Sequence, residues 1–256
     1  MDGSGPFAST ASYYVRYRPP YPAAFLSELR ALARSTGSGA LLDLACGPGR
    51  VAIPMARHFR SVLAVDVEPE MIETGEQEAA RCGATNIAWQ VERAEDLQLP
   101  AQSVELITIG DAIHRLDLTC IVERALEWLE PHGAFATLGS EPVWRGQEAW
   151  KHVLTNVVNK WTGDALGDPN AVSWGGPADA LRAAGFKVEE HEHVMPQLWT
   201  CDSIVGFMFS TSIASRRVLG DTANDFEAHL RAALLAAQPS DRFPATQRFG
   251  CTVAIR

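Results

Sequence analysis

The sequence of 256 residues contains no long hydrophobic run, so nothing in it predicts a membrane-spanning helix. Its first residues, Met1–Pro6, lack the basic-then-apolar pattern of a secretion signal. Long lysine- or arginine-rich tracts are absent too, and the formal net charge is −9. Because binding to nucleic-acid phosphates needs a basic surface, we expect neither a nucleic acid nor a membrane as partner, and favour a small molecule.

Cysteine is scarce and irregularly spaced, with residues at Cys46, Cys82, Cys120, Cys201 and Cys251. No C-x-x-C pair occurs, which argues against a zinc site and against a disulfide framework. His191 and His193 would share one face of a strand, but the sequence shows no third ligand, so we predict no metal. We expect a protein of the reducing cytoplasm.

The most informative stretch that is present is residues 41–50, LLDLACGPGR. An apolar run ending at Ala45 predicts a buried parallel strand, and Gly47 and Gly49 predict a sharp turn with bare backbone. Helical periodicity starts at Arg50, so a helix N-terminus would follow the loop and favour an anionic group. The same residues satisfy the G-x-G-x-x-A nucleotide fingerprint, which keeps a nicotinamide- or flavin-dependent enzyme as an alternative.

Acidic residues follow two neighbouring strands. Asp43 lies near the end of the first predicted strand, where a carboxylate suits a ligand with an ammonium group. The next strand, 61–65, is followed by Asp66, which could accept hydrogen bonds from both hydroxyls of a ribose. Residues 94–100 then read AEDLQLP.

The series D-L-x-C-G-x-G, V-D-x-x-x-x-M and A-E-D-L-x-L-P resembles the class I S-adenosylmethionine-dependent methyltransferases, especially the ubiquinone/menaquinone-biosynthesis and trans-aconitate type. The resemblance covers residues 13–256 and is most specific over 41–114. It implies a Rossmann-like α/β fold, with a doubly wound, seven-stranded, mostly parallel sheet and an antiparallel last strand. It also implies S-adenosylmethionine as the cofactor.

The alternation of strand and helix patterns agrees with that fold. After the first strand, strands are expected at 61–66, 87–91, 104–109, 134–138, 186–194 and 246–255, and core helices at 23–34, 69–81, 118–129 and 178–184. Residues 140–176, which hold four tryptophans, predict an inserted helical cap, and 201–238 a further helical stretch. We expect one methyltransferase domain, 1–256, whose acceptor side is built from an N-terminal lid (1–35), the cap (140–176) and residues 197–225.

The resemblance assigns cofactor roles to the residues around the first two strands. Asp43 would meet the amino group, and Gly47 with Gly49 would approach the methionine end. Asp66 would bind the ribose hydroxyls. Ala45 stands where many relatives have glycine, a change that narrows this pocket.

Further cofactor contacts follow from the resemblance. Val67 and Met71 would pack on the two faces of the adenine, although Met71 could equally be a core residue of its helix. Tyr17 and Arg18 match a segment that folds over the cofactor in the family, and simple packing of an N-terminal arm is the other interpretation.

The third-strand loop departs from the family, which commonly reads D-A-E where this chain has Arg93-Ala94-Glu95. Arginine only donates hydrogen bonds and so is unable to accept from the adenine amino group. We therefore expect the Ala94 N–H to serve a ring nitrogen, and Glu95 or Asp96 to replace the acceptor.

The fourth predicted strand is followed by residues 110–115, GDAIHR, beside the transferable methyl in the family. We place Asp111 at the cofactor and His114 either as a general base or as a residue that braces its loop. Arg115 replaces an aromatic residue of the family. Methyl transfer to oxygen or carbon of a small molecule is therefore the first hypothesis, and a non-methylating reaction such as cyclisation is the alternative. An oxidoreductase is disfavoured by Asp43.

Overall fold

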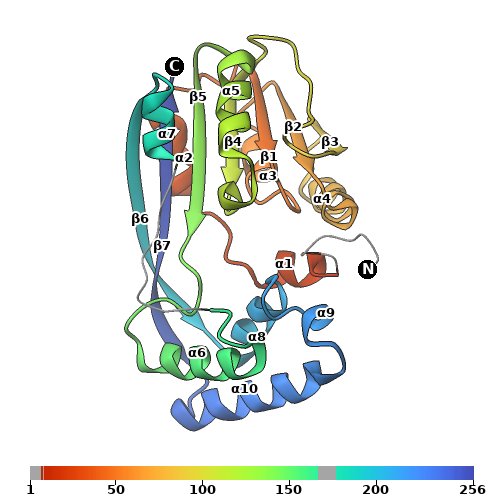
Figure 1. Cartoon of the computed structure of the whole chain (residues 1–256), viewed down its shortest axis with the longest axis vertical. Helices are drawn as coiled ribbons and strands as arrows, with labels where there is room; N and C mark the ends of the chain where they lie inside the picture. Colours follow the sequence, from red (N-terminus) through yellow and green to blue (C-terminus); the bar gives the residue numbers. More distant parts are fainter. Residues whose placement is uncertain (1–6, 8, 167–176) are drawn as a thin grey trace. The chain divides into compact units, whose positions relative to one another are not determined.

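The computed structural model describes residue 7 and residues 9–166 and 177–256 (Figure 1). The chain forms two compact units. The first, here the sheet unit, comprises residues 20–140, 174–193 and 249–256, and the second, here the helical unit, comprises residues 1–19, 141–173 and 194–248. No helix among the described residues has the length and apolar character needed to cross a membrane.

Parallel strands form the centre of the sheet unit (Figure 1). They are β1 (Ala40–Leu44), β2 (Ser61–Asp66), β3 (Ile87–Val91), β4 (Val104–Gly110) and β5 (Leu129–Ser140). With β6 (Lys187–Trp199) and β7 (Phe243–Ile255), the described residues make a seven-stranded sheet of order β3-β2-β1-β4-β5-β7-β6. Strand β7 is antiparallel to β5. The predicted fold class is confirmed.

Strand β1 lies between β2 and β4, because Leu42 pairs with Leu63 on one side and with Ile107 on the other. Leu41, Leu42 and Leu44 are fully buried, as expected for a strand covered on both faces. The strand order reverses at β1, and open α/β sheets bind ligands at the carboxyl ends of the strands beside such a reversal.

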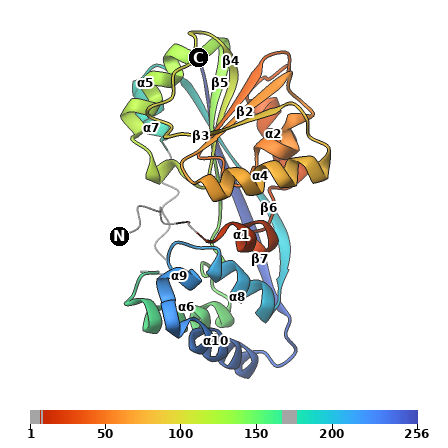
Figure 2. The same ribbon diagram turned by 90° about the vertical axis from the view of Figure 1, so that its right-hand side faces the viewer.

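Helices cover both faces of this sheet: α2 (Ala23–Leu32), α3 (Ala52–Ala56), α4 (Pro69–Cys82), α5 (Leu118–Trp128) and α7 (Ala178–Ala183). Figure 2 shows α2 and α4 on one side of the sheet and α5 and α7 on the other. Helix α4 begins with Pro69 in its first turn and ends at Gly83 in the left-handed conformation, both favoured terminal residues. At the start of α5, the Asp117 carboxylate accepts a hydrogen bond from the Cys120 N–H.

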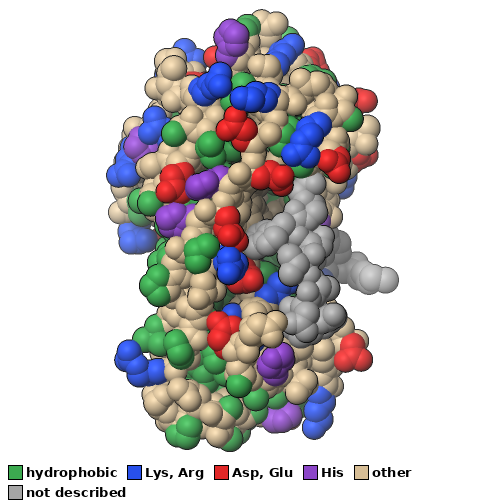
Figure 3. Space-filling model, turned by 90° about the vertical axis from the view of Figure 1, so that its left-hand side faces the viewer, with side chains coloured by type: hydrophobic (Ala, Val, Ile, Leu, Met, Phe, Trp, Pro, Cys, Tyr) green, Lys and Arg blue, Asp and Glu red, His purple; other side chains and the backbone are tan. Residues whose placement is uncertain are grey.

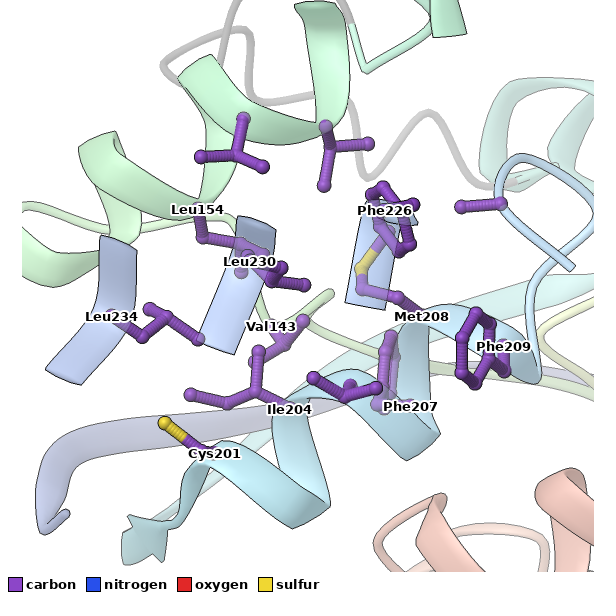
Figure 4. Packing of buried hydrophobic residues seen from close by; sticks show 14 of the residues in the cluster. Val143, Leu154, Cys201, Ile204, Phe207, Met208, Phe209, Phe226, Leu230 and Leu234 are labelled. Carbon is purple, nitrogen blue, oxygen red and sulfur yellow. The ribbon is translucent and has the colours of Figure 1, made fainter. Parts of the chain in front are cut away.

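The helical unit contains α1 (Ala11–Tyr17), α6 (Ala149–Thr162), α8 (Cys201–Phe209), α9 (Arg216–Leu219) and α10 (Ala223–Ala237). Leu154, Ile204, Met208, Phe226 and Leu230 are fully buried in its core (Figure 4). They come from α6, α8 and α10, so residues far apart in the chain share one hydrophobic core. The unit therefore has its own packing, as a compact unit should.

Most predicted boundaries lie close to the observed ones, and β2 and β3 agree residue for residue. Strand β5 begins at Leu129 instead of 134, because Leu129 pairs with Val104 and the strand continues through Pro131-His132-Gly133. The helical stretch predicted over 201–238 is broken after α8, where Ser215 caps α9 through the Val218 N–H.

The predicted lid and cap are distributed between the two units. Residues up to Pro19, including α1, belong to the helical unit, whereas α2 belongs to the sheet unit. The cap range 140–176 contributes α6 to the helical unit, and its residues 167–176 lie outside the described residues. The single catalytic domain with a lid and a cap stays a prediction.

Candidate active site

The loops that follow β1, β2, β3 and β4 lie at the same edge of the sheet, because these strands are parallel. Backbone hydrogen bonds join the loops at this edge. The Cys46 N–H donates to the Val65 carbonyl at 3.0 Å, and the Glu92 N–H donates to the Asp66 carbonyl at 3.0 Å. The predicted site residues that follow the first three strands therefore lie in loops that contact one another.

The glycine loop, residues 46–50, needs its two glycines for different reasons. Gly47 has φ +54°, and a Cβ added there would meet nothing within 4 Å, so its backbone faces open space. Gly49 has φ +85°, and a Cβ there would lie 2.7 Å from the Trp89 ring and 2.9 Å from Ile53. Gly47 thus offers bare backbone to a ligand, whereas Gly49 is also required by packing against β3.

Ala45 also has a positive φ, +50°. This region of backbone space costs an L-residue with a Cβ about 1–2 kcal/mol per residue. The conformation explains why glycine suits this position in the family resemblance, because glycine adopts it without strain.

Asp66 connects the end of β2 to the glycine loop. Its Oδ2 accepts from the Gly47 N–H at 2.8 Å, and its Oδ1 accepts from the Glu68 N–H at 2.9 Å. The side chain is only 8% exposed, and this burial raises the pKa of Asp66. Val67, the next residue, is 56% exposed and presents apolar surface beside the carboxylate. A carboxylate next to an exposed apolar side chain suits a ribose with an attached flat base.

The structure buries Asp43 inside the unit. The side chain is 1% exposed, Oδ1 accepts from the Thr108 hydroxyl at 2.8 Å, and Oδ2 accepts from the Ala52 N–H at 3.0 Å. Burial raises the pKa of Asp43 to about 7, against the opposing effect of these two hydrogen bonds. Asp43 therefore ties β4 to the first turn of α3, and its predicted contact with the cofactor's ammonium group stays a prediction.

Other predicted adenine contacts have structural partners of their own. Met71 is 2% exposed, so it is a core residue of α4, and Ala94 is also buried. One oxygen of Glu95 accepts from the Asp117 N–H at 3.1 Å, and the other lies 3.4 Å from Arg93. Glu95 thus connects the loop after β3 to the start of α5.

Tyr17 and Arg18 lie in the helical unit. The Tyr17 hydroxyl donates to Asp202 at 3.2 Å, and its ring packs against Gly206 of α8. The Arg18 guanidinium donates to the Ser210 hydroxyl at 3.1 Å and lies 4.4 Å from the centre of the Tyr14 ring. These contacts fit packing of an N-terminal arm, and the lid over the cofactor stays a prediction.

Asp111 is surrounded by hydrogen-bond donors. Arg50 Nη1 lies 2.7 Å from its Oδ2, which also accepts from the Tyr21 hydroxyl at 3.0 Å and from the Ser140 hydroxyl at 2.8 Å. Its Oδ1 accepts from the Ser140 N–H at 2.7 Å. Asp111 was predicted from the sequence to be a site residue, but its hydrogen-bond partners were not. The available signal was a pair of opposite charges in the loops that follow two parallel strands, with Arg50 at the end of the glycine loop and Asp111 directly after β4.

His114 lies on the short 3-10 turn η1 (Ile113–Arg115) and is exposed. Desolvation and the Arg115 guanidinium lower the pKa of His114, and Asp111 opposes them. The imidazole is therefore neutral at neutral pH, the state in which it can accept a proton.

His191 and His193 share one carboxylate. His191 Nε2 lies 3.0 Å and His193 Nδ1 lies 3.1 Å from the same oxygen of Glu28. The hydrogen bond with His191 is the largest influence on Glu28 and lowers its pKa. Desolvation acts in the opposite direction, and the hydrogen bond with His193 lowers the pKa further. Within the described part of the chain, no group of three or more His, Cys, Asp or Glu residues is placed to hold a metal ion.

Comparison with known proteins agrees with this geometry. Residues 41–133, which include β1 to β4 and all four loops, match the family model of a methyltransferase domain. This segment is a methyltransferase domain. A ubiquinone/menaquinone biosynthesis C-methyltransferase UbiE of Rubrivivax gelatinosus is 38% identical over 106 residues, 41% of this chain and 41% of that protein. The chain spans about half or less of the length of the curated relatives it matches.

Solved structures share the fold over most of the chain. The YcgJ protein of Bacillus subtilis superimposes with a TM-score of 0.57 at 17% identity, covering 90% of this chain and 97% of that one. The [4+2]-cyclase SpnF gives a TM-score of 0.51 at 17% identity, covering 94% and 83%. At these identities the likeness concerns the fold alone.

The residues of the methyltransferase domain fit its cofactor, S-adenosylmethionine. Gly47 leaves open space where a side chain would stand, Asp66 is a buried carboxylate, and Val67 offers exposed apolar surface. These features match a backbone approach to the methionine end, an acceptor for hydroxyls and a surface for adenine.

Proposed function

We propose that this chain transfers the methyl group of S-adenosylmethionine to an oxygen or carbon atom of a small molecule. The observation that carries the proposal is the meeting of Gly47 and Asp66, joined at 2.8 Å, within the segment matched by the methyltransferase family model. The relative named above is a C-methyltransferase, which supports carbon as one acceptor atom.

A small acceptor is favoured by the distribution of charge. The chain carries 31 acidic residues against 22 lysines and arginines. On the face shown in Figure 3, side chains of both signs are interspersed, without a continuous basic region. A nucleic-acid substrate needs such a region.

The protein's own part in the reaction is positioning and proton transfer. When bound, the cofactor supplies a methyl group activated on a sulfonium. The Gly47 backbone would hold the methionine end, Asp66 would accept from the ribose hydroxyls, and Val67 would pack on the adenine. His114, neutral at neutral pH, would take a proton from the acceptor hydroxyl or carbon acid. Holding the reactants in line supplies much of the rate acceleration in such a displacement.

The first experiment separates the competing functions. The full chain is incubated with a methyl-labelled donor and a library of small acceptors, and product masses are read. We expect one methyl gained per product, and calorimetry should show binding of S-adenosylhomocysteine but not of NADH. An acceptor that is converted without gaining a methyl would instead support a cyclisation-type reaction. Binding of NADH alone would contradict the proposal.

A His114→Ala variant tests the general base. We expect turnover to fall by about a hundredfold or more while S-adenosylhomocysteine affinity hardly changes, because the loss concerns the transition state. Because the pKa of His114 lies below its usual value near 6.5, wild-type activity should fall only on the acid side of that value. Near-normal turnover of His114→Ala would remove the base role.

The free state of all five cysteines supports a reducing cytoplasm as the place of action. We include this location in the proposed function.

A further inference from the structure

Arg50 and Asp111 form a shielded charged pair to which the proposed mechanism gives no role. Arg50 ends the glycine loop, and Asp111 begins the loop of residues 111–115, here the His114 loop. Their side chains are only 12% and 13% exposed, and Arg50 Nη1 lies 2.7 Å from Asp111 Oδ2. A shielded pair at this distance is a charge-assisted hydrogen bond, about twice as strong as a neutral one.

The Asp111 carboxylate joins its own loop to three other segments of the sheet unit. Besides Arg50, it accepts from Tyr21, which precedes α2, and from both the N–H and the hydroxyl of Ser140 at the end of β5. The Arg50 guanidinium lies 4.4 Å from the centre of the Tyr21 ring, so the arginine is itself held over an aromatic face. The pair is therefore fixed on both sides.

The backbone of Asp111 shows what these contacts maintain. Its φ is +55°, a conformation that residues other than glycine seldom adopt. Its N–H donates to the Leu138 carbonyl of β5 at 2.8 Å. This turn sets the direction in which the chain leaves β4, and His114 follows three residues later.

Charge also reaches His114 from this pair. Desolvation lowers the pKa of His114, the Arg115 guanidinium lowers it further, and the Asp111 carboxylate raises it. Arg50 in turn neutralises Asp111. Removing either member of the pair should therefore change the electrostatic environment of His114 in opposite directions.

We propose that Arg50 and Asp111 are positioning residues that couple the glycine loop, which holds the donor, to the His114 loop, which faces the acceptor. The inference rests on the proposed function, because it assigns the glycine loop to the donor and His114 to the acceptor. In this role Asp111 acts through Arg50 and His114 and does not contact the cofactor, a change from its predicted place among the cofactor residues.

The test compares the wild-type full chain with Asp111→Asn and Arg50→Met. The pKa of His114 is followed by the NMR signal of its ring, assigned with a His114→Gln variant. We expect this pKa to fall in Asp111→Asn, because the negative charge is lost beside a remaining arginine. We expect it to rise in Arg50→Met, because the carboxylate loses its counter-charge. Arg182→Met, which removes an exposed surface pair with Asp179, should leave the titration unchanged.

Coupling is measured with S-adenosylhomocysteine as the probe. Its addition should shift the His114 ring signal in the wild type and shift it much less in Arg50→Met, while its dissociation constant changes less than about threefold in either variant. With an acceptor from the library, turnover should fall tenfold or more in both variants and recover partly in Arg50→Lys. Tyr21→Phe, which removes only a hydroxyl, provides a milder variant if the others unfold, and should lower turnover severalfold.

Several results would overturn the inference. An unchanged His114 titration in both charge variants would show that the pair does not act on the imidazole. A loss of S-adenosylhomocysteine affinity as large as the loss of turnover would make the pair part of the cofactor site. If the wild type binds no S-adenosylhomocysteine, the proposed function fails, and the His114 titrations still report on the pair itself.

Discussion

Asp66 is predicted to bind the ribose hydroxyls, and the structure shows that it also accepts a hydrogen bond from the glycine loop. Replacing it with alanine removes the acceptor of the Gly47 N–H and the charge that would meet the cofactor. We expect S-adenosylhomocysteine binding to weaken by about 1.5–3 kcal/mol, the value of a hydrogen bond to a charged group. Calorimetry measures the change, with the fully exposed Asp179→Ala as control. An unchanged dissociation constant in a folded Asp66→Ala protein would exclude Asp66 from the site.

Asp43 is a single residue that makes the stability of the protein depend on pH. Its folded-state pKa is about 7 against an ordinary value of 3.8, so the folded protein holds this proton more tightly than the unfolded chain. The more tightly held proton adds to the free energy of unfolding. This added stability is fully present below pH 3.8 and declines as pH rises toward 7, by at most on the order of 4 kcal/mol. Urea unfolding of the wild type and Asp43→Asn across pH 4 to 8 measures it. A difference between the two proteins that is constant over this range would contradict the prediction.

Individual residues also show where prediction from sequence ended. The acidic residues at the ends of β1 and β2 were found because their types and spacing are local properties. The burial of Asp43 against Thr108 depends on β4 lying beside β1, 65 residues later in the chain. The Arg50–Asp111 pair likewise depends on which strands are neighbours. Side-chain partners across a sheet follow from strand order, which short motifs do not contain.

At the scale of elements, the entry into β1 depends on one carboxylate of β4. Glu105 accepts from the Ser35 hydroxyl at 2.8 Å and from the N–H groups of Gly37 and Gly39 at 2.9 and 2.6 Å. Burial acts to raise the pKa of Glu105, but these hydrogen bonds outweigh it and lower the pKa. The glutamate thereby holds the turn between α2 and β1 against the sheet.

A Glu105→Gln variant should lose about 1–3 kcal/mol of unfolding free energy, because hydrogen bonds to a charged acceptor are lost or weakened. The folded-state pKa of Glu105 is lowered. The extra stability of the wild type over Glu105→Gln should therefore be present above the ordinary glutamate pKa near 4.5 and disappear as pH falls below it. Chemical denaturation at pH 7 and pH 3 checks both statements, with the exposed Glu76→Gln as control. Equal stability of wild type and Glu105→Gln at pH 7 would contradict them.

Elements differ in how well their sequence predicts them. Parallel strands such as β2 and β3 are short and mostly apolar runs, so their bounds follow from composition. The extension of β5 through Pro131 and Gly133 was missed, because strand pairing overrides local turn signals there. The helical stretch expected over 201–238 was given without internal bounds, so the cap at Ser215 that begins α9 was not located.

At the scale of the whole molecule, a core mutation in the helical unit should lower stability without weakening cofactor binding. Leu230 of α10 is fully buried in the helical unit, whereas Leu235 on the same helix is 41% exposed. We expect Leu230→Ala to cost about 2–5 kcal/mol of stability without changing S-adenosylhomocysteine affinity at temperatures where the protein is folded. Leu235→Ala should have little effect on either. Denaturation and calorimetry measure both quantities, and a donor-affinity loss specific to Leu230→Ala would show that the helical unit shapes the cofactor site.

The division of the chain into units has a consequence for how such an enzyme can diverge. The segment matched by the methyltransferase family model, 41–133, lies wholly inside the sheet unit, and the helical unit is assembled from three stretches outside it. The helical unit can therefore take up substitutions and insertions without altering the segment that the family model matches. Under the proposed function, enzymes that share this way of binding the donor could come to differ in acceptor through changes in those three stretches alone.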